Sequence, residues 1–289
     1  MQNMFPLQVV REKSRMFRIP YENLLIGCAK ERLLDRFVAH LQEDADKKYV
    51  FSGVAALGVE CYRYSKDRTL ELKILEDAFW EEHLTEVIRL FVGEKKDEWK
   101  HQLQKTSEKE YALEVSVPFD KAVIPIVIRI TPSVAKKGVL QPVSLPLCYE
   151  NDRYIEVPSF YKEAELAECF VQFWERLELT QDLSKLELLF RMGKEYALDG
   201  RRLSEYLEQC MQEAQLQLSK ERADRFFSCD KNAHLKKRWK AYLSKEKRNE
   251  PSWEDVMGLI RNLYEPIVLQ LCKDEIFFGD WMPAVGRYL

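Results

Sequence analysis

The sequence lacks the features that mark several large protein classes. It has only 10 glycines and 11 prolines in 289 residues, too few for a collagen-like chain, a disordered chain or a glycine-cradled cofactor fold. No apolar run approaches the roughly 20 residues of a membrane-spanning helix. With 45 Lys and Arg against 48 Asp and Glu, the net charge is −3 and no overall basic field favours nucleic acid. The 46% of hydrophobic residues suffices for one large or two ordinary domains.

The cysteines and histidines form no local metal-binding motif. The seven cysteines are dispersed without a C-x-x-C pair, and the four histidines lack the spacing of a zinc motif. An odd, scattered set of cysteines predicts reduced, mostly buried thiols. Residues 1–18 carry charges and no apolar segment of the signal-peptide kind. We therefore expect a cytoplasmic protein that does not associate with a membrane.

The hydrophobic pattern divides the chain into two halves. In the first, helical periodicity at 21–46, 54–62 and 78–91 alternates with strand-like segments at 47–51, 69–75, 111–117 and 123–131, and 136–146 reads as a loop or an edge hairpin. From Ser159 to about Lys273 the pattern is helical, with a clear helix start at Ser252. We predict an α+β domain over 1–157, with a mixed sheet flanked by helices, and an all-α helical bundle over 158–289.

One segment of the first half has the order strand, small-residue turn, helix, strand. The turn is Ser52-Gly53. A small turn at a helix N-terminus exposes backbone N–H groups and the positive end of the helix dipole, which suits a phosphate. In the strand that follows, residues i and i+2 share a face, so a carboxylate pair there could hold divalent metal beside that phosphate. Paired metals activate the attacking oxygen and stabilise the leaving oxygen in nucleotidyl transfer.

These blocks resemble the abortive-infection type (AbiEii-like) nucleotidyltransferases. In that family a polymerase-β-like fold begins with a strand, Gly-Gly-x-Ala-Leu, a helix and Arg-x-Ser-x-Asp-x-Asp. Here 52–57 (SGVAAL) takes the place of the Gly-Gly turn, and 63–67 (RYSKD) matches the Arg-x-Ser-x-Asp segment. The family's "sleEilAdK…R…RDlyDl" stretch is matched in order by 166–169 (LAEC), Arg176 and 181–183 (QDL). A helix similar to 251–266 also closes many members.

The resemblance implies a nucleotidyltransferase-like fold and the toxin components of bacterial toxin–antitoxin and phage-defence systems. It implies NTP and Mg²⁺ as ligands, an RNA such as tRNA or a protein hydroxyl as acceptor, and a cognate protein partner. On this basis Asp67 and Glu71 are the catalytic, metal-binding carboxylates. The residues that it assigns to the nucleotide are Ser52, Gly53, Arg68, Lys73 and Arg176.

The carboxylate pair departs from the family's pattern in either alignment. If Asp67 is the first carboxylate, the second position is Thr69; if Glu71 is the first, the second is Lys73. The later strand offers only Arg129 where a third carboxylate would stand. Either the site is degenerate, or Asp67 and Glu71 combine in a rearranged geometry. Two functions stay open: a nucleotidyltransferase-like protein, and a non-catalytic scaffold that uses the two-domain cleft for a protein or nucleic-acid partner.

A basic segment stands out in the second half. Residues 231–248 hold eight Lys and Arg against one acid, with Trp239 and Tyr242 interleaved. Clustered cations with aromatic stacking partners suit nucleic acid. The candidate contact residues are Lys236, Lys237, Arg238, Trp239 and Lys240. The alternative, and the commoner origin of such a pattern, is the solvated face of an amphipathic helix.

Overall fold

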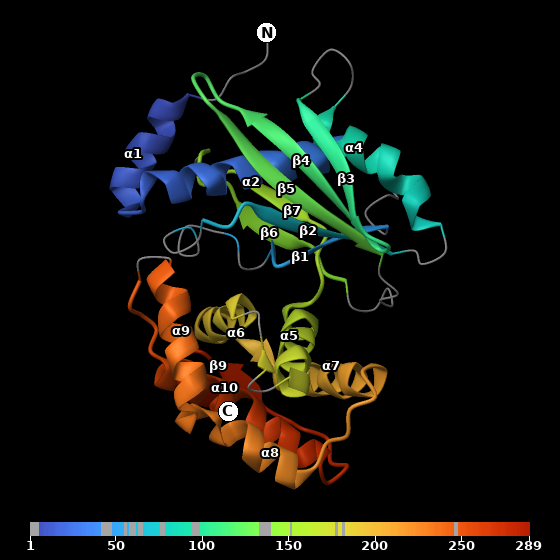
Figure 1. Cartoon of the computed structure of the whole chain (residues 1–289), viewed down its shortest axis with the longest axis vertical. Helices are drawn as coiled ribbons and strands as arrows, with labels where there is room; N and C mark the ends of the chain where they lie inside the picture. Colours follow the sequence, from blue (N-terminus) through green and yellow to red (C-terminus); the bar gives the residue numbers. More distant parts are fainter. Residues whose placement is uncertain are drawn as a thin grey trace. The chain divides into compact units, whose positions relative to one another are not determined.

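The computed structural model describes residues 6–41, 48–54, 57, 62, 66–75, 79–93, 99–132, 140–150, 152–176, 179–180, 183–245 and 248–289. The chain forms two compact units, Met1–Phe160 and Tyr161–Leu289, called here the first and the second unit (Figure 1). The first contains a mixed β-sheet with helices, and the second is mainly helical. The predicted α+β class is thereby confirmed. No helix within the described residues is long and apolar enough to cross a membrane.

A five-stranded sheet is the centre of the first unit. Its order is β1 (Tyr49–Ser52), β2 (Thr69–Ile74), β5 (Val123–Pro132), β4 (Glu110–Pro118) and β3 (His101–Ser107). Strands β2 and β5 are parallel, and the other neighbours are antiparallel. Leucine and isoleucine alternate with polar residues in β2, so every second side chain is buried. The polar residues of β2 therefore lie on the other face of the sheet, called here the outer face.

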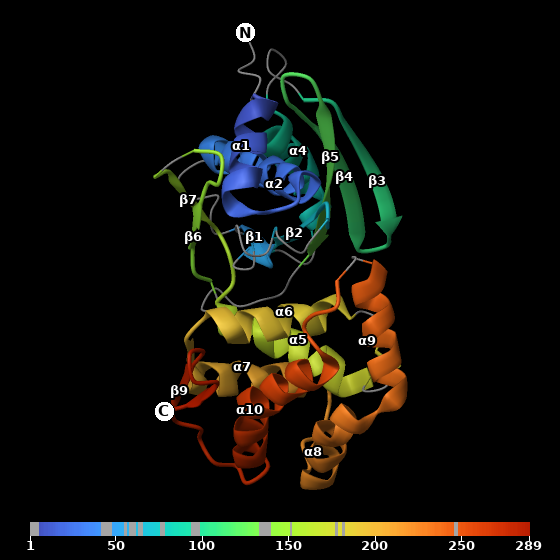
Figure 2. The same ribbon diagram turned by 90° about the vertical axis from the view of Figure 1, so that its left-hand side faces the viewer.

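Helices cover the apolar face of this sheet. They are α1 (Leu7–Phe17), α2 (Tyr21–His40), the short 3₁₀ helix η3 (Trp80–His83) and α4 (Leu84–Val92). The hairpin of β6 (Val143–Pro146) and β7 (Tyr154–Val157) pairs by itself. Figure 2 shows α2 between the sheet and this hairpin, and α2 packs against both β5 and β7. Helix α2 is thus buried on two sides.

Three aromatic rings join α2, β1 and α4. The ring centroid of Phe37 lies 5.0 Å from that of Phe51 and 4.8 Å from that of Phe91. Such edge-on and tilted contacts add to the free energy of burying the rings. Because Phe51 directly precedes Ser52, this packing fixes the end of β1 where the predicted phosphate-binding turn begins.

The second unit packs its helices around an aromatic core. Its helices are α5 (Lys162–Arg176), α6 (Ser184–Glu195), α7 (Gly200–Glu213), α8 (Lys220–Phe227), the 3₁₀ helix η6 (Ser228–Lys231), α9 (Ala233–Lys245) and α10 (Trp253–Leu271). Phe170 stacks on Tyr264 with centroids 4.0 Å apart. The predicted helix start at Ser252 is confirmed, because Ser252 and Asp255 form a reciprocal capping box.

This unit also contains strands, where the sequence pattern predicts only helices. Three short strands, β8 (Leu198–Asp199), β9 (Asp280–Met282) and β10 (Arg287–Tyr288), form an antiparallel sheet in the order β10-β9-β8. Two or three residues carry no readable alternation, so the pattern could not reveal them. The buried Trp281 anchors the middle strand through a 2.6 Å hydrogen bond from its indole N–H to the carbonyl of Gly193.

Candidate functional site

Ser52, Glu71 and Arg129 lie side by side across three neighbouring strands. Ser52 of β1 is directly opposite Glu71 of β2, and Glu71 is level with Arg129 of β5. Neighbouring strands are about 4.8 Å apart, so these side chains project from one face within reach of one another. It is the outer face, because the alternate residues Leu70 and Leu72 are buried on the other side. Strand pairing thus brings three residues from distant positions into one row.

Cations surround the carboxylate of this row. Lys73 follows Glu71 on the same face of β2, and its ammonium lies 5.3 Å from the ring centroid of Phe160. Arg68 precedes β2, and its carbonyl accepts the N–H of Val127 at 2.8 Å, which fixes the start of β2 against β5. Arg68 takes the alternate position, on the side of Leu70, and is not part of this row, but with Lys73 and Arg129 against Glu71 the row has one net positive charge. It favours anions over divalent cations.

Asp67 is held in an ion pair with Lys30. The ammonium of Lys30 lies 3.1 Å from Oδ2 of Asp67, while Oδ1 accepts the N–H of Thr69 at 3.0 Å. The side chain of Lys30 is 7% exposed in the middle of α2, and that of Asp67 is 59% exposed. Since α2 packs on the apolar face of the sheet, this pair directs Asp67 toward the helix side. Glu71 lies on the outer face.

The residues present do not fit the Mg²⁺ pair that the resemblance implies. Two-metal sites hold their ions about 4 Å apart between shared anionic ligands. Instead, Asp67 forms an ion pair with Lys30, and Glu71 has Lys73 and Arg129 as neighbours on the sheet. Asp67 and Glu71 as a metal-binding pair therefore stay a prediction from the resemblance. Among the described residues, the grouping with metal-site spacing is a different one, Cys28, Glu31 and Cys148, inside the first unit.

Gly53 gives the turn after β1 its conformation. Gly53 has φ +74°, a left-handed conformation that favours glycine, and a Cβ built there would meet nothing within 4 Å. The hydroxyl-bearing Ser52 is half-buried beside it. Most of the predicted helix 54–62, and the matching residues 63–65, lie outside the described residues. Among the described residues, the turn thus has space beside Gly53 where a larger side chain would stand, and its role as a phosphate site stays a prediction.

The candidate binding residues of the second unit differ in how far they are exposed to solvent. Arg176 is exposed in the last turn of α5, and Lys237 and Lys240 are exposed on α9. Lys236 forms an ion pair with Glu254, and Arg238 is half-buried. That these lysines and arginines contact nucleic acid therefore stays a prediction.

Trp239 requires a correction. Its side chain is 0% exposed, and its indole N–H donates to the carbonyl of Pro251 at 2.8 Å. An indole inside the core offers no face to a nucleic-acid base, so the predicted stacking role does not hold. Helical spacing explains the burial, because Leu235, Trp239 and Leu243 form the apolar side of α9.

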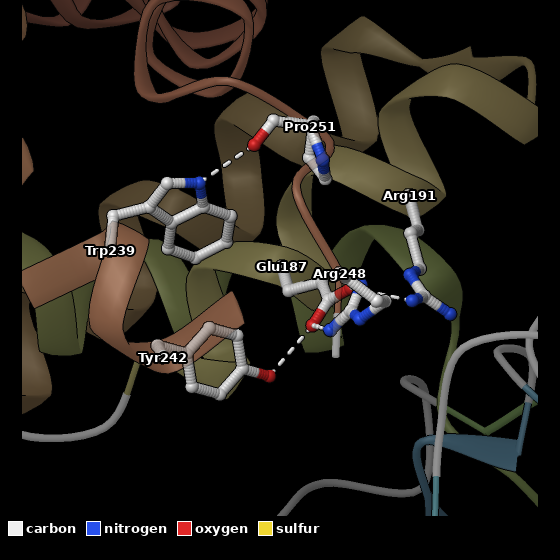
Figure 3. Close-up of polar contacts among 6 residues, drawn as sticks. All are labelled: Glu187, Arg191, Trp239, Tyr242, Arg248 and Pro251. Atoms are coloured by element: carbon white, nitrogen blue, oxygen red, sulfur yellow. Dashed lines mark hydrogen bonds and ion pairs between the residues drawn. The ribbon is translucent and has the colours of Figure 1, made fainter. Parts of the chain in front are cut away.

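A buried carboxylate organises the region around α9, which the sequence pattern did not predict. Glu187 of α6 receives hydrogen bonds from Arg248, from Arg191 and, at 2.7 Å, from the hydroxyl of Tyr242 (Figure 3). Burial by itself would raise the pKa of Glu187, but the hydrogen bonds from Arg248 and Tyr242 and the charge of Arg191 outweigh it and lower the pKa. The cluster ties α9 and the segment after it to α6.

Sequence reasoning also missed Lys30, the partner of Asp67. Its signal is a run of three charged residues, Lys30, Glu31 and Arg32, between the apolar residues Ala29 and Leu33 of α2. As whole residues, Lys30 and Glu31 are 5% and 0% exposed. Charged residues are rarely so buried unless they are paired. Two adjacent charges on the apolar side of a predicted helix therefore indicate specific partners.

The sequence matches no protein-family model and no curated protein. Among solved structures, the chain is similar to MenT4, a nucleotidyltransferase toxin from Mycobacterium tuberculosis H37Rv, with a TM-score of 0.51 and 15% identity over 91% of this chain and 98% of that one. It is also similar to a proposed nucleotidyltransferase from H. pylori, with a TM-score of 0.50 and 11% identity over 90% of this chain and 100% of that one. At such identities the similarity shows the fold alone, and the predicted nucleotidyltransferase-like fold is confirmed.

Proposed function

We propose that the chain binds a nucleoside triphosphate on the outer face of β1, β2 and β5, and that Mg²⁺-dependent transfer of the nucleotide to an RNA or protein hydroxyl is weak or absent. The observation that carries this proposal is the pairing of Asp67 with Lys30. If Asp67 is the family's first metal ligand, as one alignment implies, its pairing with the ammonium of Lys30 supports a site without a bound divalent cation. The fold is that of a transferase, whereas the charges are those of an anion-binding site.

The phosphates have suitable partners on this face. Among the described residues there is space where a side chain of residue 53 would stand, and Ser52 adds a hydroxyl donor beside it. Arg129 can present two parallel N–H groups to phosphate oxygens, and Lys73 adds a point charge. Glu71, which lies between Ser52 and Arg129, is placed to accept from a sugar hydroxyl. Nucleotide binding is thus supported without a carboxylate pair.

Calorimetry with each of the four NTPs, followed by transfer assays, tests the proposal. Removing a cation that contacts phosphate costs about 1.5 kcal/mol or more, so Lys73→Ala and Arg129→Ala should each weaken binding about tenfold. The matched control is Lys109→Ala, which removes an exposed cation in the turn between β3 and β4 of the same unit. Its affinity should equal that of the wild type.

The transfer assay uses each labelled NTP with Mg²⁺ or Mn²⁺ and either bulk tRNA or a co-encoded protein. We expect binding without robust transfer. Strong transfer that is lost in Asp67→Ala or Glu71→Ala would contradict the degenerate site and restore an active transferase. If no NTP binds to the folded protein, the chain is a scaffold for a protein or nucleic-acid partner and the proposal is wrong.

A further inference from the structure

Two thiols and a carboxylate meet in the interior of the first unit. The sulfur of Cys28 lies 3.3 Å from that of Cys148, 120 residues away in the chain. Their sulfurs and a carboxylate oxygen of Glu31 all lie within 4.8 Å of one another. Exposure is 1% for Cys28, 0% for Glu31 and 7% for Cys148. Cys28 and Glu31 are three residues apart on one side of α2, and Cys148 lies in the turn between β6 and β7.

The two carboxylate oxygens of Glu31 have different surroundings. Oε2 accepts the N–H of Cys148 at 2.8 Å, whereas the buried Oε1 makes no hydrogen bond of regular geometry among the described residues and has the hydroxyl of Tyr62 as its neighbour. Buried carboxylates are otherwise paired or bound to metal ions, because an unpaired one is strongly penalised. The backbone N–H thus holds the group in the way that outer-shell hydrogen bonds hold metal-binding carboxylates.

We propose that Cys28, Glu31 and Cys148 bind a divalent, zinc-type cation that links α2 to the turn between β6 and β7. Zinc accepts two thiolates and a carboxylate in one tetrahedral site. At a Zn–S distance of about 2.3 Å, tetrahedral geometry separates the two sulfurs by about 3.8 Å. The observed 3.3 Å is closer to that value than to the roughly 2.05 Å of a disulfide.

The surroundings suit the charge of such a site. Two thiolates, one carboxylate and a divalent ion sum to one negative charge. The guanidinium of Arg32 is close enough to Cys28 for the two charges to interact, and it lies over the rings of Trp99 and Phe119. The buried hydroxyl of Tyr62 lies next to the same cluster, where it can donate to the carboxylate of Glu31 and orient it.

A metal at this site would hold Lys30 in place. Lys30 lies between Cys28 and Glu31 in α2, so a metal bound to both neighbours fixes the turn of helix that carries the partner of Asp67. The ligands come from sequence positions far apart, so no spacing motif marks them. The metal would act as a structural tie, separate from the outer face of the sheet.

Metal content of the full chain tests the proposal. The protein is chelated, reconstituted with Zn²⁺, dialysed, and analysed by elemental mass spectrometry. We expect one zinc per chain in the wild type, at most a tenth of that in Cys28→Ser and Cys148→Ser, and at least a tenfold lower affinity in Glu31→Gln. The matched control is Cys229→Ser, which changes a buried cysteine of the second unit and should leave the zinc content unchanged.

Two measurements on the wild type keep the proposal falsifiable if a cysteine variant fails to fold. Co²⁺ substitution should give the near-ultraviolet band of sulfur-to-cobalt charge transfer, and Zn²⁺ should raise the melting temperature reversibly against a chelator. Wild-type protein that retains no zinc after reconstitution would overturn the proposal. A disulfide between Cys28 and Cys148, seen as an intact mass two daltons low and a linked peptide, would also overturn it. The same holds if Cys229→Ser loses as much zinc as the ligand variants do.

Discussion

Lys30 and Asp67 form an ion pair in which the cation is almost completely buried and the carboxylate is mostly exposed. A buried ammonium needs a partner, because its desolvation costs several kcal/mol. Asp67 meets that need from the start of β2, and through Oδ1 it also fixes the N–H of Thr69. The residue that the sequence offers as a metal ligand therefore has a structural task in this fold.

The first prediction concerns the stability that this pair supplies. Asp67→Ala leaves the buried Lys30 without this carboxylate and should cost about 1–3 kcal/mol of unfolding free energy. Glu71→Ala, at an exposed position of the same strand, should change it by less than about 0.5 kcal/mol. Urea unfolding of both variants measures whether Asp67, unlike Glu71, has a structural role. In Lys30→Met/Asp67→Ala most of the loss should be recovered, and a double variant no more stable than Asp67→Ala would contradict the coupling.

The second prediction restores a carboxylate pair. Lys73→Asp places a second carboxylate two residues from Glu71 on the same face of β2, and it removes a repelling ammonium. Mn²⁺ affinity, measured by electron paramagnetic resonance, should increase at least tenfold over the wild type. Lys73→Ala removes the same charge without adding a ligand and should give a much smaller gain. Equal gains in both variants would mean that charge alone, and not paired ligands, controls metal binding.

The third prediction separates the core of α9 from its surface. Trp239→Ala removes a fully buried indole and should cost about 3–5 kcal/mol, whereas Lys237→Glu and Lys240→Glu at exposed positions should leave stability within about 0.5 kcal/mol. If α9 contacts RNA, the two lysine variants weaken binding and flatten its dependence on salt concentration. Thermal unfolding and filter binding measure the two effects. A stable Trp239→Ala with lost RNA binding would reinstate the stacking role.

Periodicity predicted most of the fold because burial on one side leaves a repeating pattern. Strands β2, β4 and β5 alternate buried and exposed residues, and all three lie close to their predicted ranges. The edge strand β3 was missed, because His101–Ser107 is exposed along almost its whole length and pairs only with β4. Its polar residues carry no alternation, so only the partner strand reveals it.

The site was less predictable than the fold, because its decisive contacts join distant segments. The pattern placed Glu71 in its strand and Gly53 in the turn, but it also placed in the turn Ser52, which is the last residue of β1. It could not reveal that Arg129 is level with Glu71, since that depends on the register between β2 and β5. It also could not reveal the pairing of Asp67 with Lys30, 37 residues away. Tertiary pairing, and not local pattern, determines the charge of the candidate site.

The last prediction is a pH dependence of the buried cluster around Glu187. The pKa of this carboxyl is lowered in the folded protein, because the hydrogen bonds from Arg248 and Tyr242 and the charge of Arg191 outweigh the effect of burial. A depressed pKa contributes stability that is present above the unfolded-state pKa of about 4.5 and is lost as the pH falls through the folded-state value. The wild type should therefore lose stability steeply below about pH 4.5.

Glu187→Gln isolates this contribution. At pH 7 it leaves two guanidinium groups without their carboxylate and should cost about 3–5 kcal/mol. The cost should shrink as the pH falls below about 4.5, because the wild-type carboxyl then also becomes neutral. The matched control is Glu205→Gln, which breaks a pair with Arg201 of the same i, i+4 spacing but fully on the surface, and which should cost less than about 1 kcal/mol at either pH. Urea unfolding followed by helical circular dichroism at pH 7 and pH 3.5 gives both differences. A cost for Glu187→Gln that is the same at the two pH values would show that the cluster acts through packing and not through charge.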